Sequence, residues 1–72
     1  MTSTEILIEI EKLKDGERFV VPESDYGKAE IWLKHNTYFL FSIPIYGGEP
    51  QFESYFKSNR LMELIEEIDS WT

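Results

Sequence analysis

The chain has 72 residues, no cysteine and a formal net charge of −7, with 42% hydrophobic and 15% aromatic residues. This length predicts a single domain, residues 1–72, whose core alone supplies only about 3–5 kcal/mol of net stability. Disulfides are excluded, and His35, the single histidine, cannot complete the usual zinc sets of Cys and His ligands. We therefore expect no metal and no other cofactor, and we expect stability to come from good packing or from a partner chain.

The charge balance argues against direct binding to nucleic acid or to an anionic membrane. Nucleic-acid-binding domains cluster Lys and Arg, whereas the seven bases of this chain are scattered among fourteen acids. The longest apolar run, residues 38–41, is too short to span a bilayer, and the N-terminus carries no positively charged signal region. The sequence therefore predicts a cytoplasmic protein.

The first segment, residues 4–14, fits two patterns. Its isoleucines alternate with other residues as in a strand, yet two of them also fall with Leu13 on one helical stripe. Thr2 and Glu5 have the spacing of a capping box, in which each residue caps the backbone of the other. Gly16 stands at a plausible helix C-terminus. These capping signals favour a helix.

Three or four antiparallel strands are predicted next, because apolar and polar residues alternate between turn-forming stretches. Their expected bounds are residues 17–22, 29–34, 38–43 and 51–56. In the last strand the alternation directs Phe52, Ser54 and Phe56 inward and Glu53 and Tyr55 outward.

The register of the central hairpin follows from the loop length that best sorts side chains by polarity. A two-residue loop at Asn36 and Thr37 would pair Lys34 with Phe39. A three-residue loop, residues 35–37, keeps polar and apolar residues apart and is our prediction, with Asn36 or Thr37 at positive φ. It pairs Ile31 with Phe41 and Leu33 with Phe39 on one face, and Trp32 with Leu40 and Lys34 with Tyr38 on the other.

A C-terminal helix is predicted after a cap at Ser58 or Asn59, because the apolar residues that follow have helical spacing. The fold class is therefore α+β, a small antiparallel meander of three to four strands flanked by N- and C-terminal helices. The simplest topology places both helices on one face of the sheet. The expected core is Ile6, Ile10, Leu13, Phe19, Val21, Ile31, Leu33, Phe39, Phe41, Ile43, Phe52, Phe56, Leu61, Leu64, Ile65 and Ile68.

An aromatic face is predicted on the side of the sheet away from the helices, and it is too apolar to meet only water. A loop between Pro44 and Pro50 would present further apolar side chains beside it. We expect a non-enzymatic protein–protein interaction module that self-associates, with a second copy of the chain as its partner. The predicted interface residues are Trp32, Tyr38, Leu40, Tyr55, Ile45 and Tyr46, with Val20 on the same face.

Two alternative functions remain at this point. The C-terminal helix carries an acidic face, which would suit a decoy of the phage or mobile-element type that occupies the basic groove of a nucleic-acid-binding protein. An enzyme or enzyme subunit has less support, because the chain has no cysteine and no Gly-x-Ser-x-Gly motif, and His35 lies in a predicted turn. We therefore expect no catalytic residues. The acidic face consists of Glu63, Glu66, Glu67 and Asp69.

Overall fold

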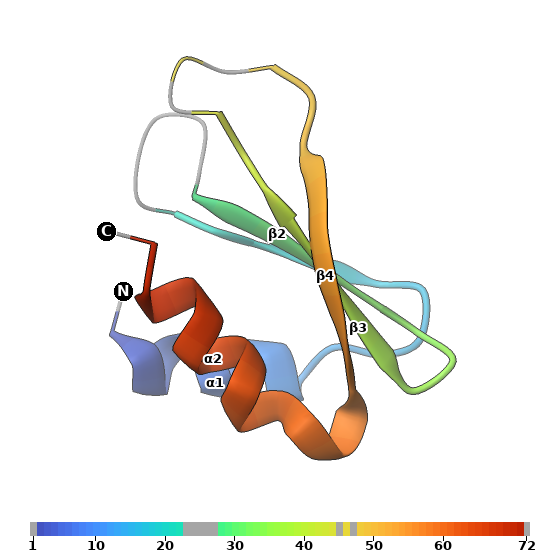
Figure 1. The fold of residues 1–72 in the computed structure, drawn as a ribbon. Helices are drawn as coiled ribbons and strands as arrows, with labels where there is room; N and C mark the ends of the chain where they lie inside the picture. Colours follow the sequence, from blue (N-terminus) through green and yellow to red (C-terminus); the bar gives the residue numbers. More distant parts are fainter. Residues whose placement is uncertain (1, 23–27, 45, 47, 72) are drawn as a thin grey trace.

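The structure is a computed structural model that describes residues 2–22, 28–44, 46 and 48–71. Within these residues a helix, an antiparallel meander and a second helix follow one another (Figure 1), which confirms the predicted α+β class. Neither helix has the length and apolar content needed to cross a membrane. The elements are α1 (Ser3–Glu11), β1 (Arg18–Val21), β2 (Ala29–Lys34), β3 (Thr37–Ser42), β4 (Gln51–Lys57), the 3-10 helix η1 (Ser58–Arg60) and α2 (Leu61–Asp69).

Helix α1 begins with the predicted capping box. The Thr2 hydroxyl accepts a hydrogen bond from the Glu5 backbone N–H (3.2 Å), and the Glu5 carboxylate accepts one from the Thr2 N–H (3.1 Å). The bond from the Thr2 N–H is the main cause that holds the pKa of the Glu5 carboxyl below its ordinary value. The helix ends at Glu11, so the prediction that Gly16 caps it was wrong. Gly16 takes a φ of +87° in the turn into β1 and donates its N–H to the Leu33 carbonyl (2.7 Å).

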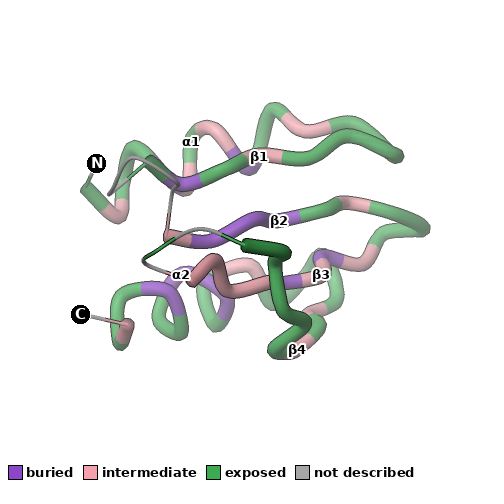
Figure 2. The backbone as a smooth tube through the Cα atoms, turned by 90° about the horizontal axis from the view of Figure 1, so that it is seen from above, coloured by how far each residue is buried: buried purple, intermediate pink, exposed green. Residues whose placement is uncertain are grey.

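Both helices cover the same face of the sheet, as the simplest topology predicted (Figure 1). Buried residues lie in parts of β2, β3 and α2, whereas every residue of β4 is exposed or half-buried (Figure 2). In the described part of the chain, no helix covers the sheet face that lies away from α1 and α2, which we call the outer face. The buried core consists of Ile6, Ile10, Val21, Ala29, Ile31, Tyr38, Leu40, Leu64, Ile65 and Ile68.

The central hairpin differs from its predicted register by one residue. Its turn consists of His35 and Asn36, both at positive φ (53° and 59°), and Lys34 pairs with Thr37. Two positive φ values in a two-residue loop match the right-handed twist of the flanking strands. His35 tolerates this conformation because its backbone N–H donates a hydrogen bond to the Asp15 carboxylate (2.6 Å).

The shift moves every β3 side chain to the opposite face of the sheet. Tyr38 and Leu40 were wrongly predicted on the outer face and are buried in the core. Phe39 and Phe41 were wrongly predicted in the core and lie on the outer face, because they alternate with Tyr38 and Leu40 along the strand. The observed pairs are Ile31 with Leu40, Trp32 with Phe39, Leu33 with Tyr38 and Lys34 with Thr37.

A bulge in β4 moves a further predicted core residue outward. The pairing of β3 with β4 shifts between Leu40 and Phe41, which leaves Glu53 as the extra residue. Phe52 is 55% exposed, and its ring meets that of Phe41 edge-on with 5.7 Å between centroids. The predicted alternation therefore holds only beyond the bulge, where Phe56 packs against the core.

Replacing Ile68 with alanine should destabilise the fold by about 2–5 kcal/mol, because the side chain is fully buried. This loss is comparable with the whole stability of so small a domain. Met62→Ala is the matched control, since Met62 lies on the same helix and is 60% exposed. Urea unfolding followed by circular dichroism compares the variants. Equal midpoints for Ile68→Ala and the unmodified chain would contradict the packing of α2.

Tyr38 allows the hairpin register to be tested by pH. Burial raises the pKa of its phenol above the ordinary value of 10.0, and the charge of Glu11 raises it further. The folded state therefore holds the phenolic proton more tightly than the unfolded chain does. The contribution of Tyr38 to stability is intact below about pH 10 and is lost as pH rises above that value.

Tyr38→Phe should consequently reduce the alkaline loss of stability, measured as urea midpoints at about pH 8 and about pH 11. An ultraviolet difference titration of the two proteins gives the ionisation of Tyr38 directly. Ionisation at the ordinary pKa of a solvated phenol would place Tyr38 outside the core and contradict the observed register.

Candidate interaction surface

Side chains on the outer face stand in rows that run across the strands. In the main row, Arg18 of β1 lies opposite Trp32 of β2, Trp32 lies opposite Phe39 of β3, and Phe39 lies opposite Tyr55 of β4. We call Trp32, Phe39 and Tyr55 the aromatic row. Tyr55 is 63% exposed. The row thus forms a continuous aromatic band across the middle of an uncovered sheet face.

A second row extends this apolar band toward the loop between β3 and β4. It consists of Val20, Glu30, Phe41 and Phe52, each opposite the next in the register. Val20 and Phe52 are exposed and Phe41 is half-buried. Together the two rows place five aromatic rings on the outer face, which makes it an apolar patch of the kind that marks interaction sites.

One ion pair lies within this apolar surface. Glu30 is only 5% exposed, and its carboxylate accepts a hydrogen bond from the Arg18 guanidinium (2.8 Å). The same guanidinium lies 5.5 Å from the centroid of the Trp32 ring. Arg18 therefore neutralises a buried carboxylate and holds an aromatic ring through a cation–π contact at the same time. This arrangement orders the side chains at the β1 end of the aromatic row.

The outer face also has a hollow and a basic end. The hollow, about 410 Å³, is lined by Arg18, Glu30, Trp32, Phe41, Glu49 and Pro50, and we call it the outer hollow. Lys34 and Lys57 lie at the opposite end of the sheet, each opposite Thr37 in the register. The outer face is therefore basic near the β2–β3 turn, aromatic in its middle and acidic near Glu49.

The structure brings together only part of the predicted interface. Trp32 and Tyr55 lie in the aromatic row, whereas Tyr38 and Leu40 are core residues. Tyr46 is highly exposed in its loop, and Ile45 lies outside the described residues. The sequence reasoning missed the outward positions of Phe39, Phe41 and Phe52. A two-residue turn at His35 and Asn36 was the pattern that would have found the first two.

All four residues of the predicted acidic face are exposed, but two of them have structural partners. Asp69 accepts a hydrogen bond from the Ser3 hydroxyl (2.5 Å), which joins the end of α2 to the start of α1. Glu63 pairs with Arg60 at 3.6 Å. The outward acidic surface of α2 is therefore carried mainly by Glu66 and Glu67.

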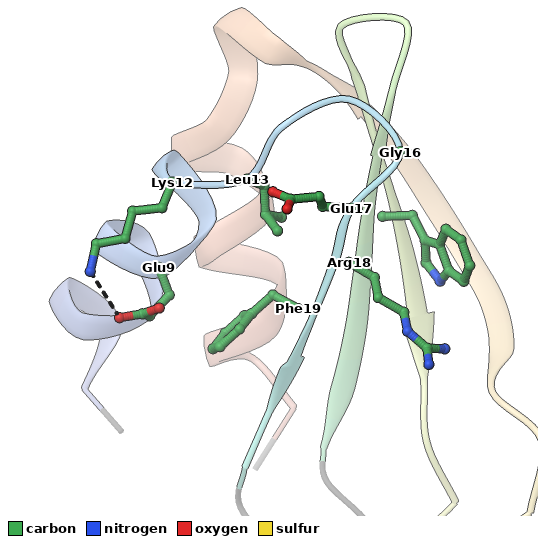
Figure 3. Close-up of a pocket in the computed structure, with 8 residues that line it drawn as sticks. Glu9, Lys12, Leu13, Gly16, Glu17, Arg18 and Phe19 are labelled. Atoms are coloured by element: carbon green, nitrogen blue, oxygen red, sulfur yellow. Dashed lines mark hydrogen bonds and ion pairs between the residues drawn. The ribbon is translucent and has the colours of Figure 1, made fainter.

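A larger open hollow, about 710 Å³, lies along the edge of β1 (Figure 3). The Phe19 ring points toward α1 in this view, while Arg18 lies on the other side of the strand. Charged side chains that line this hollow contact their sequence neighbours. Lys12 forms an ion pair with Glu9 at 3.4 Å, and the Glu17 carboxylate accepts a hydrogen bond from the Lys14 N–H at 2.7 Å. These contacts are typical of a structural surface.

Both sheet edges carry features that oppose pairing with a further strand. Strand β1 has only four residues, and β4 contains the bulge at Glu53. Within the described part of the chain, no group of three or more His, Asp or Glu side chains is arranged to hold a metal ion. The outer face is therefore the best candidate for a functional surface.

Comparisons with protein-family models, with curated proteins and with solved structures give no match to this chain.

Removing Arg18 should destabilise the chain, because Glu30 would be left buried without its ion-pair partner. We expect Arg18→Ala to cost about 1–3 kcal/mol. Glu30→Gln in the same chain should restore part of that loss, since an amide needs no counter-charge. Urea unfolding of the two single variants and the double variant forms a double-mutant cycle. Strictly additive effects would show that the two side chains are not coupled.

Proposed function

We propose that this chain is a non-enzymatic protein–protein interaction module that self-associates through its outer face. The observation that carries the proposal is the aromatic row, which both helices leave uncovered. Interface centres are enriched in Tyr, Trp, Phe and Arg. The outer face offers all four residue types in two adjacent rows. The Arg18 contacts to Glu30 and Trp32 order part of this surface before any partner binds, which lowers the entropy lost on association.

A second copy of the chain is the partner that we propose. Under two-fold symmetry the same patch is buried on both chains at once, so each copy covers the exposed rings of the other. A standard interface takes about 800 Å² from each partner, which is about a sixth of the 4948 Å² surface of this chain. Burial of the outer face would also add stability that a core of this size supplies only sparingly.

The proposal is tested by measuring molecular mass against concentration by analytical ultracentrifugation. The unmodified chain should form a dimer, and Tyr55→Ser and Phe52→Ser should each weaken it about tenfold or more, as removal of a buried aromatic anchor does. Trp32→Glu should give a folded monomer. Met62→Ser is the matched control, because Met62 is as exposed as these rings but lies on α2.

Circular dichroism of each variant is the control that checks whether it is folded. An unmodified chain that stays monomeric at several hundred micromolar would overturn the proposal. So would a Met62→Ser variant that dissociates as readily as the outer-face variants.

The acidic decoy is a second candidate function. It is favoured by the acids that both helices present on the side of the molecule away from the outer face. Such binding to a basic partner would be mainly electrostatic and would weaken steeply with salt. Glu66→Gln with Glu67→Gln separates the two functions. It should leave self-association unchanged, because neither residue lies on the outer face, whereas a decoy would lose affinity.

The proposal includes a cytoplasmic location. The absence of cysteine is compatible with a reducing compartment.

A further inference from the structure

The charges on the outer face are separated along the strand direction. Lys34 and Lys57 flank Thr37 in the row nearest the β2–β3 turn. Glu30 and Glu49 lie on the other side of the aromatic row and line the outer hollow. Arg18, which stands opposite Trp32 at the end of that row, also lines the hollow. The hollow therefore has one positive and two negative side chains, and the opposite end of the face has two positive side chains.

Two copies can place these faces together in two simple ways. A two-fold axis parallel to the strands would set like ends together, so that Lys34 would face the basic end of its partner. A two-fold axis that crosses the strands reverses one copy end to end, so that each basic end meets the acidic hollow of the other. Like charges placed opposite each other in an interface are costly, and opposite charges fix its register.

We propose that the two copies are related by an axis that crosses the strands along the aromatic row, with Lys34 of each chain entering the outer hollow of the other. This inference rests on the self-association proposed above and adds its symmetry and its charge partners. Along such an axis each strand faces its own copy, and Lys34 lies as far on one side of Trp32 as Glu30 lies on the other.

The chemistry of the outer hollow fits a lysine from the second copy. Its two carboxylates exceed its one guanidinium by one charge, which a single ammonium group balances. Packed sheets lie about 10 Å apart, a gap that a lysine side chain entering from the facing sheet can cross. Arg18 lies close to the axis and therefore close to Arg18 of the second copy, but its charge is already paired with Glu30 of its own chain at 2.8 Å. The aromatic rows meet each other between the two charged regions.

A charge-exchange experiment tests this arrangement. Lys34→Glu and Glu49→Lys should each raise the dissociation constant of the dimer about tenfold or more, because each places like charges together. The double variant should return to within about threefold of the unmodified chain, because the charge pair is re-formed with reversed signs. Both residues are exposed, so the fold should persist in each variant, as circular dichroism will show.

Lys12→Glu is the matched control. It changes the net charge as Lys34→Glu does, but it follows α1 on the helix side of the molecule. It should leave the dissociation constant within about threefold of the original value, since exposed charges farther apart than about 10 Å are largely screened at moderate salt.

The outcomes separate the two proposals. If the unmodified chain is monomeric, self-association itself is wrong. If it is a dimer that Tyr55→Ser breaks, but Lys34→Glu tightens it, the two basic ends face each other and the inferred axis is wrong. Additive weakening in the double variant, without recovery, would also overturn the pairing of Lys34 with the outer hollow.

Discussion

The two-residue turn at His35 and Asn36 determines which side chains of β3 enter the core. Both residues take positive φ, and the turn is held from two sides. Asp15 accepts the His35 N–H at 2.6 Å, and the Asn36 carbonyl accepts the Ser58 N–H at 2.9 Å. The turn is thereby attached to the segments that precede β1 and follow β4. One more residue in this loop would exchange the core and surface residues of β3.

The arrangement of two helices on one sheet face links stability to association. Helix residues such as Ile10 and Leu64 form a closed core with Ile31 and Leu40, and this core uses only one side of the sheet. A domain of this size has little stability to spare. The other side carries aromatic rings rather than the polar residues that a solvated sheet face usually has. In the proposed dimer, burial of those rings would stabilise each chain as well as the complex.

The sequence predicted both helices correctly, but the predicted cap of α2 at Ser58 or Asn59 was wrong, because its N-cap is Arg60. It predicted the sheet faces only in part. Signals such as the Thr2 capping box are local, so they can be read without knowing the rest of the fold. The face of a strand residue depends instead on counting residues through a turn. Because His35 was not expected at positive φ, that count was wrong by one for β3. The contact of Arg18 with Glu30 depends on the pairing of β1 with β2, a register that the sequence reasoning did not assign. Trp32 and Tyr55 were placed correctly because their own strands kept the predicted alternation.

The bulge at Glu53 determines on which face of the sheet the apolar side chain of Phe52 lies. If the same residues paired regularly, with Glu53 opposite Phe41, Phe52 would lie opposite Ser42 on the helix side of the sheet. The bulge therefore keeps the Phe52 ring on the outer face, and a deletion of Glu53, which would join Phe52 directly to Ser54, would leave the ring opposite Phe41. Loss of the bulge with every residue retained would alter the outer face as strongly as a substitution within it.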